Sequence, residues 1–178
     1  MKKNSRLRFN FGFILEAGLG TSRDMELDYP EVHIDDVTLT PLKGSFQVIR
    51  SSKGLYISGE LSSTTETECS RCLDSIRIPI SIRMDDLFYY PASTAPPGDF
   101  GVGEDGFVDL NPLVRQLSLL AIPLQPFCRP DCKGLCMHCG QNLNVDSCDC
   151  EIEDVDPRLE SLRSLLEAQS NIENDNSI

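Results

Sequence analysis

The sequence has no tryptophan, only two histidines, and few aromatic residues, which make up 7% of its 178 positions. With two histidines, general acid–base catalysis has few candidate side chains. The chain also lacks the phosphate-cradling GxxxxGK[ST] pattern and the GxSxG pattern, and no pair of carboxylates forms a recognisable catalytic arrangement. These absences argue against the enzyme classes that such patterns mark, and we expect a protein that is not an enzyme.

Long apolar runs are missing as well. No stretch approaches the roughly 20 apolar residues that cross a bilayer. Asn10, Gly12 and Glu16 interrupt the apolar run near the N-terminus, which is unlike a secretory signal. We therefore expect a soluble, cytoplasmic protein with no membrane partner and no small-molecule substrate. In that reducing compartment, disulfides would not persist.

Positive charge is scarce, since 16 lysines and arginines face 28 aspartates and glutamates and leave a net charge of -12. A protein that grips bare nucleic acid normally needs a basic face. Residues 151–178 carry eight acidic and two basic side chains, which suits either a solvated helix face or a contact with a basic partner. A basic protein is therefore the more natural direct partner.

Strand patterns fill residues 25–90. Apolar residues alternate with polar ones at Phe46, Val48, Leu55, Ile57 and Leu61, and again at Ile76, Ile78, Ile80 and Ile82. This is typical of half-buried strands. Pro79 indicates an edge or a bulge, while Lys43-Gly44 and Ser52-Lys53-Gly54 predict turns. The fold class that we predict is α+β: an antiparallel β meander or partly closed barrel, a few helices and a cysteine-rich, zinc-binding C-terminal segment.

The chain divides into four predicted parts. Residues 1–90 form a mainly β domain, in which residues 9–17 could be a short helix or a first strand, with the helix favoured. The proline- and glycine-rich residues 91–106 form a flexible loop. Residues 107–170 contain a helix, a zinc knuckle and a C-terminal helix, all packing on the same domain, and 171–178 form a disordered tail. The first helix is capped by Asn111, and the second starts at Asp156-Pro157. Their buried stripes are Leu113, Leu117 and Leu120 for the first, and Leu159, Leu162, Leu165 and Leu166 for the second.

Cysteine is concentrated in one place. Six of the eight cysteines lie within 23 positions, at Cys128, Cys132, Cys136, Cys139, Cys148 and Cys150. Cys136-x2-Cys139-Gly140 is typical of a zinc knuckle, and Zn²⁺ takes four ligands in a tetrahedron. Asn142 and Asn144 suit the loop that leads back to the last two cysteines, because asparagine tolerates turns and left-handed backbone. We predict a structural zinc, since this segment has too few large apolar side chains to build its own core.

The ligand set stays open at this point. One zinc could take four of the six thiolates, or two metals could share them. A third arrangement adds Cys69 and Cys72, a second C-x2-C pair that follows a strand pattern, so that two groups of four are filled. An iron–sulfur cluster is a further possibility. His138 lies between two knuckle cysteines and is expected to point away from the metal.

Cys69 and Cys72 have other interpretations. They could form the redox pair of a thiol oxidoreductase, or a simple turn with packed thiols. A redox pair usually opens a helix, whereas this one is predicted at a strand end. Arg71 between them is a candidate contact for RNA or a partner, as is Lys133. A zinc-ribbon adaptor in transcription is a third functional alternative.

Several stretches together resemble the YceD family. These are "CSRCL", "DLNPLVRQLSLLAIPLQPFC", "DCKGLCMHCGQNLNVDSCDC" and "DPRLESLRSL", so that the likeness runs from about residue 10 to 167. Met137-His138 departs from the family pattern, in which a proline-containing step is expected. The resemblance implies a non-enzymatic role in accumulation or processing of 23S ribosomal RNA and in large-subunit assembly. It implies a ribosomal protein or large-subunit assembly factor as partner, with ribosomal RNA itself as an alternative.

Overall fold

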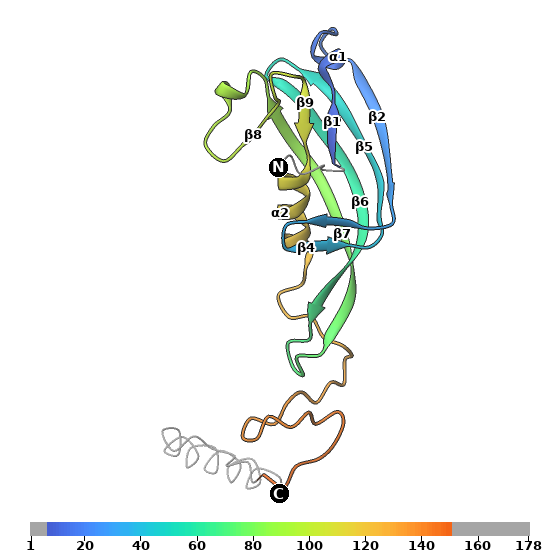
Figure 1. Cartoon of the computed structure of the whole chain (residues 1–178), viewed down its shortest axis with the longest axis vertical. Helices are drawn as coiled ribbons and strands as arrows, with labels where there is room; N and C mark the ends of the chain where they lie inside the picture. The colour runs from blue at the N-terminus through green and yellow to red at the C-terminus, as the bar shows by residue number, and fades with distance from the viewer. Residues whose placement is uncertain (1–6, 151–178) are drawn as a thin grey trace, which may run out of the picture. The chain divides into compact units, whose positions relative to one another are not determined.

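The computed structural model describes residues 7–150, and the chain divides into two compact units, Met1–Cys132 and Lys133–Ile178. The first unit is built mostly of strands (Figure 1). Its elements follow the order β1 (Arg8–Asn10), α1 (Gly12–Leu15), β2 (Ser22–Tyr29), β3 (Val32–Ile34), β4 (Val37–Leu39), β5 (Leu42–Ser51), β6 (Gly54–Glu68), β7 (Ser75–Tyr89), the 3₁₀ turn η1 (Ala92–Thr94), β8 (Phe100–Gly101), β9 (Phe107–Asp109) and α2 (Asn111–Ala121).

The main sheet has five strands in the order β2-β5-β6-β7-β8. All pairs are antiparallel except β7 with β8, which meet in parallel at Phe88 and Tyr89. Two further antiparallel pairs, β1 with β9 and β3 with β4, complete the strands of the described residues. The predicted antiparallel meander is confirmed for β5, β6 and β7. No closed barrel forms within residues 7–150, where β2 and β8 remain two separate sheet edges.

The alternation of the sequence sets which side chains enter the core. Phe46, Val48, Leu55, Ile57 and Leu61 are buried as predicted, because period-two side chains point to the same face of a strand. Ile80 and Ile82 are buried too, whereas Ile76 and Ile78 at the start of β7 are only half-buried. The helix α2 packs against β7 and β4 and covers this core (Figure 1).

Three local predictions need correction. Lys43-Gly44 does not turn the chain but lies inside β5, where a Cβ on Gly44 would come 2.3 Å from the Glu60 carbonyl oxygen of β6. Only glycine allows that approach, and its φ of +147° is one that side-chain-bearing residues rarely adopt. The segment 9–17 holds both a strand, β1, and the short helix α1, rather than a helix alone. The turn at Ser52-Lys53-Gly54 is confirmed.

The third correction concerns α2. Its first residue is Asn111, which gives no side-chain cap; instead the Asn111 backbone N–H donates to Asp109 Oδ1 over 2.9 Å. Its buried face contains Leu113, Val114 and Ser118, whereas Leu120 is 80% exposed. The predicted helical spacing of the buried stripe is correct, but Leu120 does not belong to it.

The β6–β7 hairpin reaches beyond the rest of the sheet. Pairing between β5 and β6 stops at Lys43 with Ser62, while β6 and β7 continue to Glu68 with Ser75. Pro79 lies in this part of β7, whose other side meets β8 only at Phe88 and Tyr89 within the described residues. The predicted edge position of Pro79 is therefore confirmed. The hairpin ends in the loop that carries Cys69 and Cys72.

Residues 91–106, predicted as a flexible loop, contain η1 and β8, and Val102 is buried against the core. Their flexibility stays a prediction, as does the packing of residues 107–170 on the β domain. The predicted C-terminal helix and the tail at 171–178 lie outside the described residues. Among residues 7–150, no helix is both long enough and apolar enough to cross a membrane.

A candidate metal centre of two cysteine tetrads

The eight cysteines fall into two groups of four. We call Cys69, Cys72, Cys128 and Cys132 the first tetrad, and Cys136, Cys139, Cys148 and Cys150 the second tetrad. Within each tetrad all four sulfur atoms lie within 4.8 Å of one another. This is the four-plus-four arrangement of the sequence analysis. It divides the six clustered cysteines between the two tetrads, because Cys128 and Cys132 join the distant pair Cys69 and Cys72.

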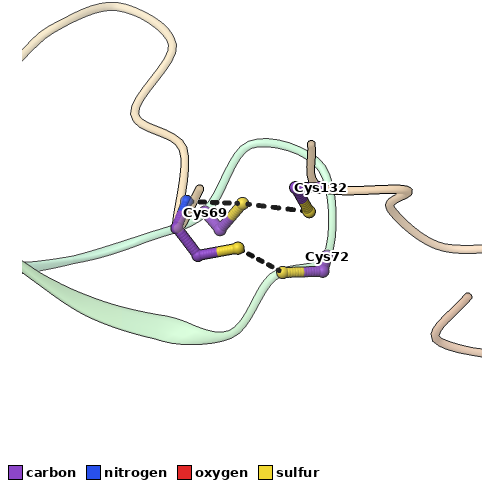
Figure 2. Close-up of side chains that lie close together, drawn as sticks. Cys69, Cys72 and Cys132 are labelled. Carbon is purple, nitrogen blue, oxygen red and sulfur yellow. Dashed lines mark hydrogen bonds between the residues drawn. The ribbon is translucent and has the colours of Figure 1, made fainter. Parts of the chain in front are cut away.

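The first tetrad joins the tip of the β6–β7 hairpin to the segment that follows α2. The sulfur atoms of Cys69, Cys72 and Cys132 turn toward one another (Figure 2). Cys69 Sγ lies 3.9 Å from Cys132 Sγ, and Cys72 Sγ lies 3.7 Å from Cys128 Sγ. None of the eight cysteines, all of which lie within residues 7–150, forms a disulfide. Four sulfurs at about 2.3 Å from a central Zn²⁺ would lie about 3.8 Å apart, so these separations fit a tetrahedral site.

The hairpin loop has the backbone geometry of a knuckle. The Leu73 N–H donates to the Cys69 carbonyl over 3.0 Å, with Leu73 in the left-handed region at φ +60°. The second tetrad repeats this turn: the Gly140 N–H donates to the Cys136 carbonyl over 2.9 Å, with Gly140 at φ +74°. Both C-x2-C pairs therefore adopt the same turn, although only the second has the expected glycine directly after its second cysteine. The leucine hid this likeness in the sequence.

Backbone amides stabilise one thiolate in each tetrad. Hydrogen bonds from the Cys72 and Arg71 amides lower the pKa of Cys69 to about 6, and those from the Cys139 and His138 amides lower the pKa of Cys136 to about 6. A hydrogen bond with the Cys139 side chain, together with burial, raises the pKa of Cys150 to about 12. Each tetrad thus favours one thiolate among neighbouring thiols. A divalent cation would displace the remaining protons and neutralise the thiolates.

The thiol pKa does not make Cys69 and Cys72 a redox pair. A redox C-x-x-C gains its low pKa from the start of a helix, and no helix begins here, since the pair lies between β6 and β7. The same lowering occurs at Cys136, which has the same turn. Cys69 is fully buried, and Cys72 is 3% exposed, so a substrate disulfide would have poor access. The geometry favours a metal over thiol exchange.

Arg71 is engaged within the first unit. Its Nη1 donates to the Cys132 carbonyl over 2.9 Å, and its guanidinium lies 4.6 Å from the centre of the Phe127 ring. The Ser70 N–H also donates to the Pro126 carbonyl over 2.8 Å. These contacts fasten the hairpin tip to the segment that brings Cys128 and Cys132. A contact between Arg71 and RNA stays a prediction. In the structure, this side chain links the hairpin tip to Phe127 and Cys132.

Replacing Arg71 by alanine is expected to lower the free energy of unfolding of the metal-loaded protein by about 1–3 kcal/mol, because a charge-assisted hydrogen bond and a cation–π contact are lost together. Chemical denaturation measures this. Arg77→Ala is the matched control, since Arg77 pairs with Glu66 on the exposed surface, where ion pairs contribute at most about 1 kcal/mol. Equal losses in the two variants would contradict the role given to Arg71.

The second tetrad is built by a short local turn. The Cys136 N–H donates to the Gln141 carbonyl over 2.8 Å, and Leu135 forms an antiparallel bridge with Asn142. Asn144 lies in a turn, as expected, but neither Asn142 nor Asn144 adopts left-handed backbone. Their side chains act instead: Asn144 Oδ1 accepts the Lys133 N–H over 2.9 Å, and Asn142 Oδ1 accepts the Asn144 N–H over 3.0 Å.

Within the described residues 133–150, no large apolar side chain is fully buried beneath this turn. Among residues 133–150, Leu135 and Leu143 are half-buried, while Met137 is 96% exposed and Val145 is 81% exposed. Cys136 is the only side chain of this stretch with less than a tenth of its surface exposed. His138 is exposed and belongs to neither tetrad, and Lys133 is exposed as well. A contact between Lys133 and RNA stays a prediction.

Comparison with known proteins gives one family. The family model described as "Large ribosomal RNA subunit accumulation protein YceD" matches residues 57–166, a range that contains all eight cysteines. An uncharacterised protein of Mycobacterium tuberculosis is 33% identical over 123 residues, which cover 67% of this chain and 59% of that protein. The Bacillus subtilis protein YlbN, also uncharacterised, is 29% identical over 130 residues, covering 72% of this chain and 76% of that protein.

A third relative has an informative name. The Arabidopsis thaliana protein named "Large ribosomal RNA subunit accumulation protein YCED homolog 1, chloroplastic" is 27% identical over 180 residues, covering 84% of this chain and 54% of that protein. The chain thus spans between half and three fifths of the length of the Arabidopsis and mycobacterial relatives. No solved structure matches it.

Proposed function

Because the chain belongs to the YceD family, we propose that it is a non-enzymatic factor that promotes accumulation of 23S ribosomal RNA and assembly of the large ribosomal subunit, with structural zinc in its cysteine tetrads. The observation that carries this is the family match over residues 57–166, which spans β7, α2 and both tetrads. The name of the Arabidopsis relative supports the same process.

Zinc is the metal that the donor set favours. Four thiolates in a tetrahedral arrangement suit Zn²⁺ or an iron–sulfur cluster. Sulfur–sulfur separations of 3.7 and 3.9 Å match the edge of a single-ion ZnS₄ tetrahedron, whereas a cluster also needs room for its bridging sulfides. When bound, the zinc would supply four strong bonds and no free coordination position, so the site would hold the chain rather than activate a water or a substrate.

A basic protein is the direct partner that the surface favours. One face of the main sheet carries a hollow of about 750 Å³, which is lined by the exposed carboxylates Glu26, Asp28 and Glu60. Lys43 is the only cation in this lining, and it forms an ion pair with Asp28 at 3.1 Å. Complementary charge across an interface steers association. A ribosomal protein or an assembly factor with an exposed basic segment would meet this condition.

Depletion of the protein is expected to lower the ratio of large- to small-subunit ribosomal RNA, because the small-subunit RNA does not depend on it. Quantifying the two RNA species in depleted cells measures this ratio directly. Wild-type protein supplied in trans should restore the ratio, and a Cys69→Ser/Cys136→Ser variant should restore it poorly. An unchanged ratio after complete depletion would rule out the proposed function.

A further inference from the structure

The two tetrads differ in how well the protein shields them. In the first tetrad Cys69, Cys72 and Cys132 are 0%, 3% and 4% exposed, and only Cys128 is open to solvent. In the second tetrad only Cys136 is buried, Cys139 is exposed, and the other two are half-buried. An oxidant dissolved in water therefore reaches the second tetrad more readily, since thiol oxidation follows exposure and thiolate character.

The supporting structures differ as well. Two cysteines of the first tetrad lie in the loop that joins β6 and β7 of the main sheet, and the Cys128 N–H donates to Cys69 Sγ over 3.4 Å. Arg71 and Ser70 add the contacts described above. The second tetrad lies in a turn whose described residues bury no large apolar side chain. Segments with few buried apolar contacts open locally at low free energy, so a metal in the second tetrad would be exposed to competing reagents more often.

Chain spacing favours disulfides once that metal is lost. Cys136 and Cys139 are separated by two residues, and Cys148 and Cys150 are separated by one residue. The first tetrad also contains close pairs, Cys69 with Cys72 and Cys128 with Cys132, but three of these four side chains are buried, so an oxidant reaches them less readily. Neighbouring thiols combine quickly after one of them is oxidised to a sulfenic acid, because no long loop has to close.

We propose that the second tetrad is a peroxide-sensitive metal switch, whereas the first tetrad keeps its metal; this rests on the zinc assignment made above. Each of two molecules of hydrogen peroxide takes two electrons from a pair of thiolates and, with two protons, leaves two waters and one disulfide. Four thiolates thus become two disulfides, and one Zn²⁺ is released. The consequence is a form in which the β-sheet unit is intact while residues 133–150 have lost their metal-held turn.

The test uses the full chain loaded with zinc and titrated with hydrogen peroxide. Released zinc is followed with a colorimetric chelator, and the oxidised cysteines are identified by mass spectrometry of alkylated peptides. One equivalent should leave about tenfold faster than the other, which corresponds to about 1.4 kcal/mol in the free energy of local opening. Disulfides should appear among Cys136, Cys139, Cys148 and Cys150, while the first tetrad stays reduced.

The outcomes are distinct. Simultaneous release of both equivalents, or earlier oxidation of the first tetrad, would overturn the switch while leaving the zinc assignment in place. Zinc absent from the untreated chain would instead remove the zinc assignment itself. A Cys139→Ser/Cys150→Ser variant provides a second measurement, since it should bind one equivalent only and should release it at the slow rate. Release at the fast rate would contradict the proposal.

Discussion

Replacing Cys136 by serine should remove one metal ion from the full chain and unfold residues 133–150. The reason is that the described residues 133–150 bury no large apolar side chain that could hold the turn in place of the metal. Structural zinc contributes about 10–16 kcal/mol in finger peptides near neutral pH, whereas fully burying one leucine contributes about 1.5–3 kcal/mol. Leu135 and Leu143 are only half-buried, so their packing cannot replace the metal.

Amide hydrogen exchange measures this loss residue by residue. In the wild-type protein the N–H groups of Cys136, Gly140 and Leu143, which donate to backbone carbonyls, should be protected, and in Cys136→Ser they should exchange at the rate of an unfolded chain. His138→Ala is the matched control, because His138 lies in the same turn, is exposed and belongs to neither tetrad. Protection retained in Cys136→Ser would show that the turn folds without its metal.

Replacing Cys72 by serine has the second largest expected effect. It should release the other metal ion and detach the segment that carries Cys128 and Cys132 from the hairpin tip. The sheet itself should stay folded, since its core of buried apolar side chains, which runs from Leu7 to Val114, includes none of the cysteines. The free energy of local unfolding should fall more at the hairpin tip than in the rest of the sheet, because the β6 residues beyond Ser62 have no β5 partner.

Alkylation of native protein separates the possible outcomes for this variant. Cys69 and Cys132 should become reactive in Cys72→Ser, while circular dichroism should still report the strands. Leu73→Gly is the control: glycine adopts the left-handed backbone of this position without strain, as Gly140 does in the second knuckle, so this variant should keep both metal ions. Loss of metal from Leu73→Gly, or unreactive thiols in Cys72→Ser, would contradict the assigned role of the first tetrad.

The sequence predicted the strands of the core and one of the two knuckles. Period-two alternation identified β5, β6 and β7, because one face of each strand must be apolar to be buried. Proline and glycine patterns were less informative. Gly44 was predicted to lie in a turn, but glycine is needed there because the Glu60 backbone of β6 approaches it closely. That approach depends on strand register, which the sequence of one segment does not reveal.

The division of the cysteines needed the three-dimensional structure. Local spacing grouped Cys128 and Cys132 with the four cysteines that follow, since they are neighbours along the chain. Their partners are instead Cys69 and Cys72, about sixty positions earlier. That pairing results from the length of the β6–β7 hairpin and from the chain path after α2. The matching turn was also concealed by Leu73, which occupies a position where knuckles usually have glycine.

Native mass spectrometry of the full chain under reducing conditions tests the central claim most directly. The account predicts a chain that carries two zinc ions, one removed by Cys136→Ser and the other by Cys72→Ser, with no disulfide in the untreated protein. A metal-free chain whose residues 133–150 are still protected from hydrogen exchange would contradict it.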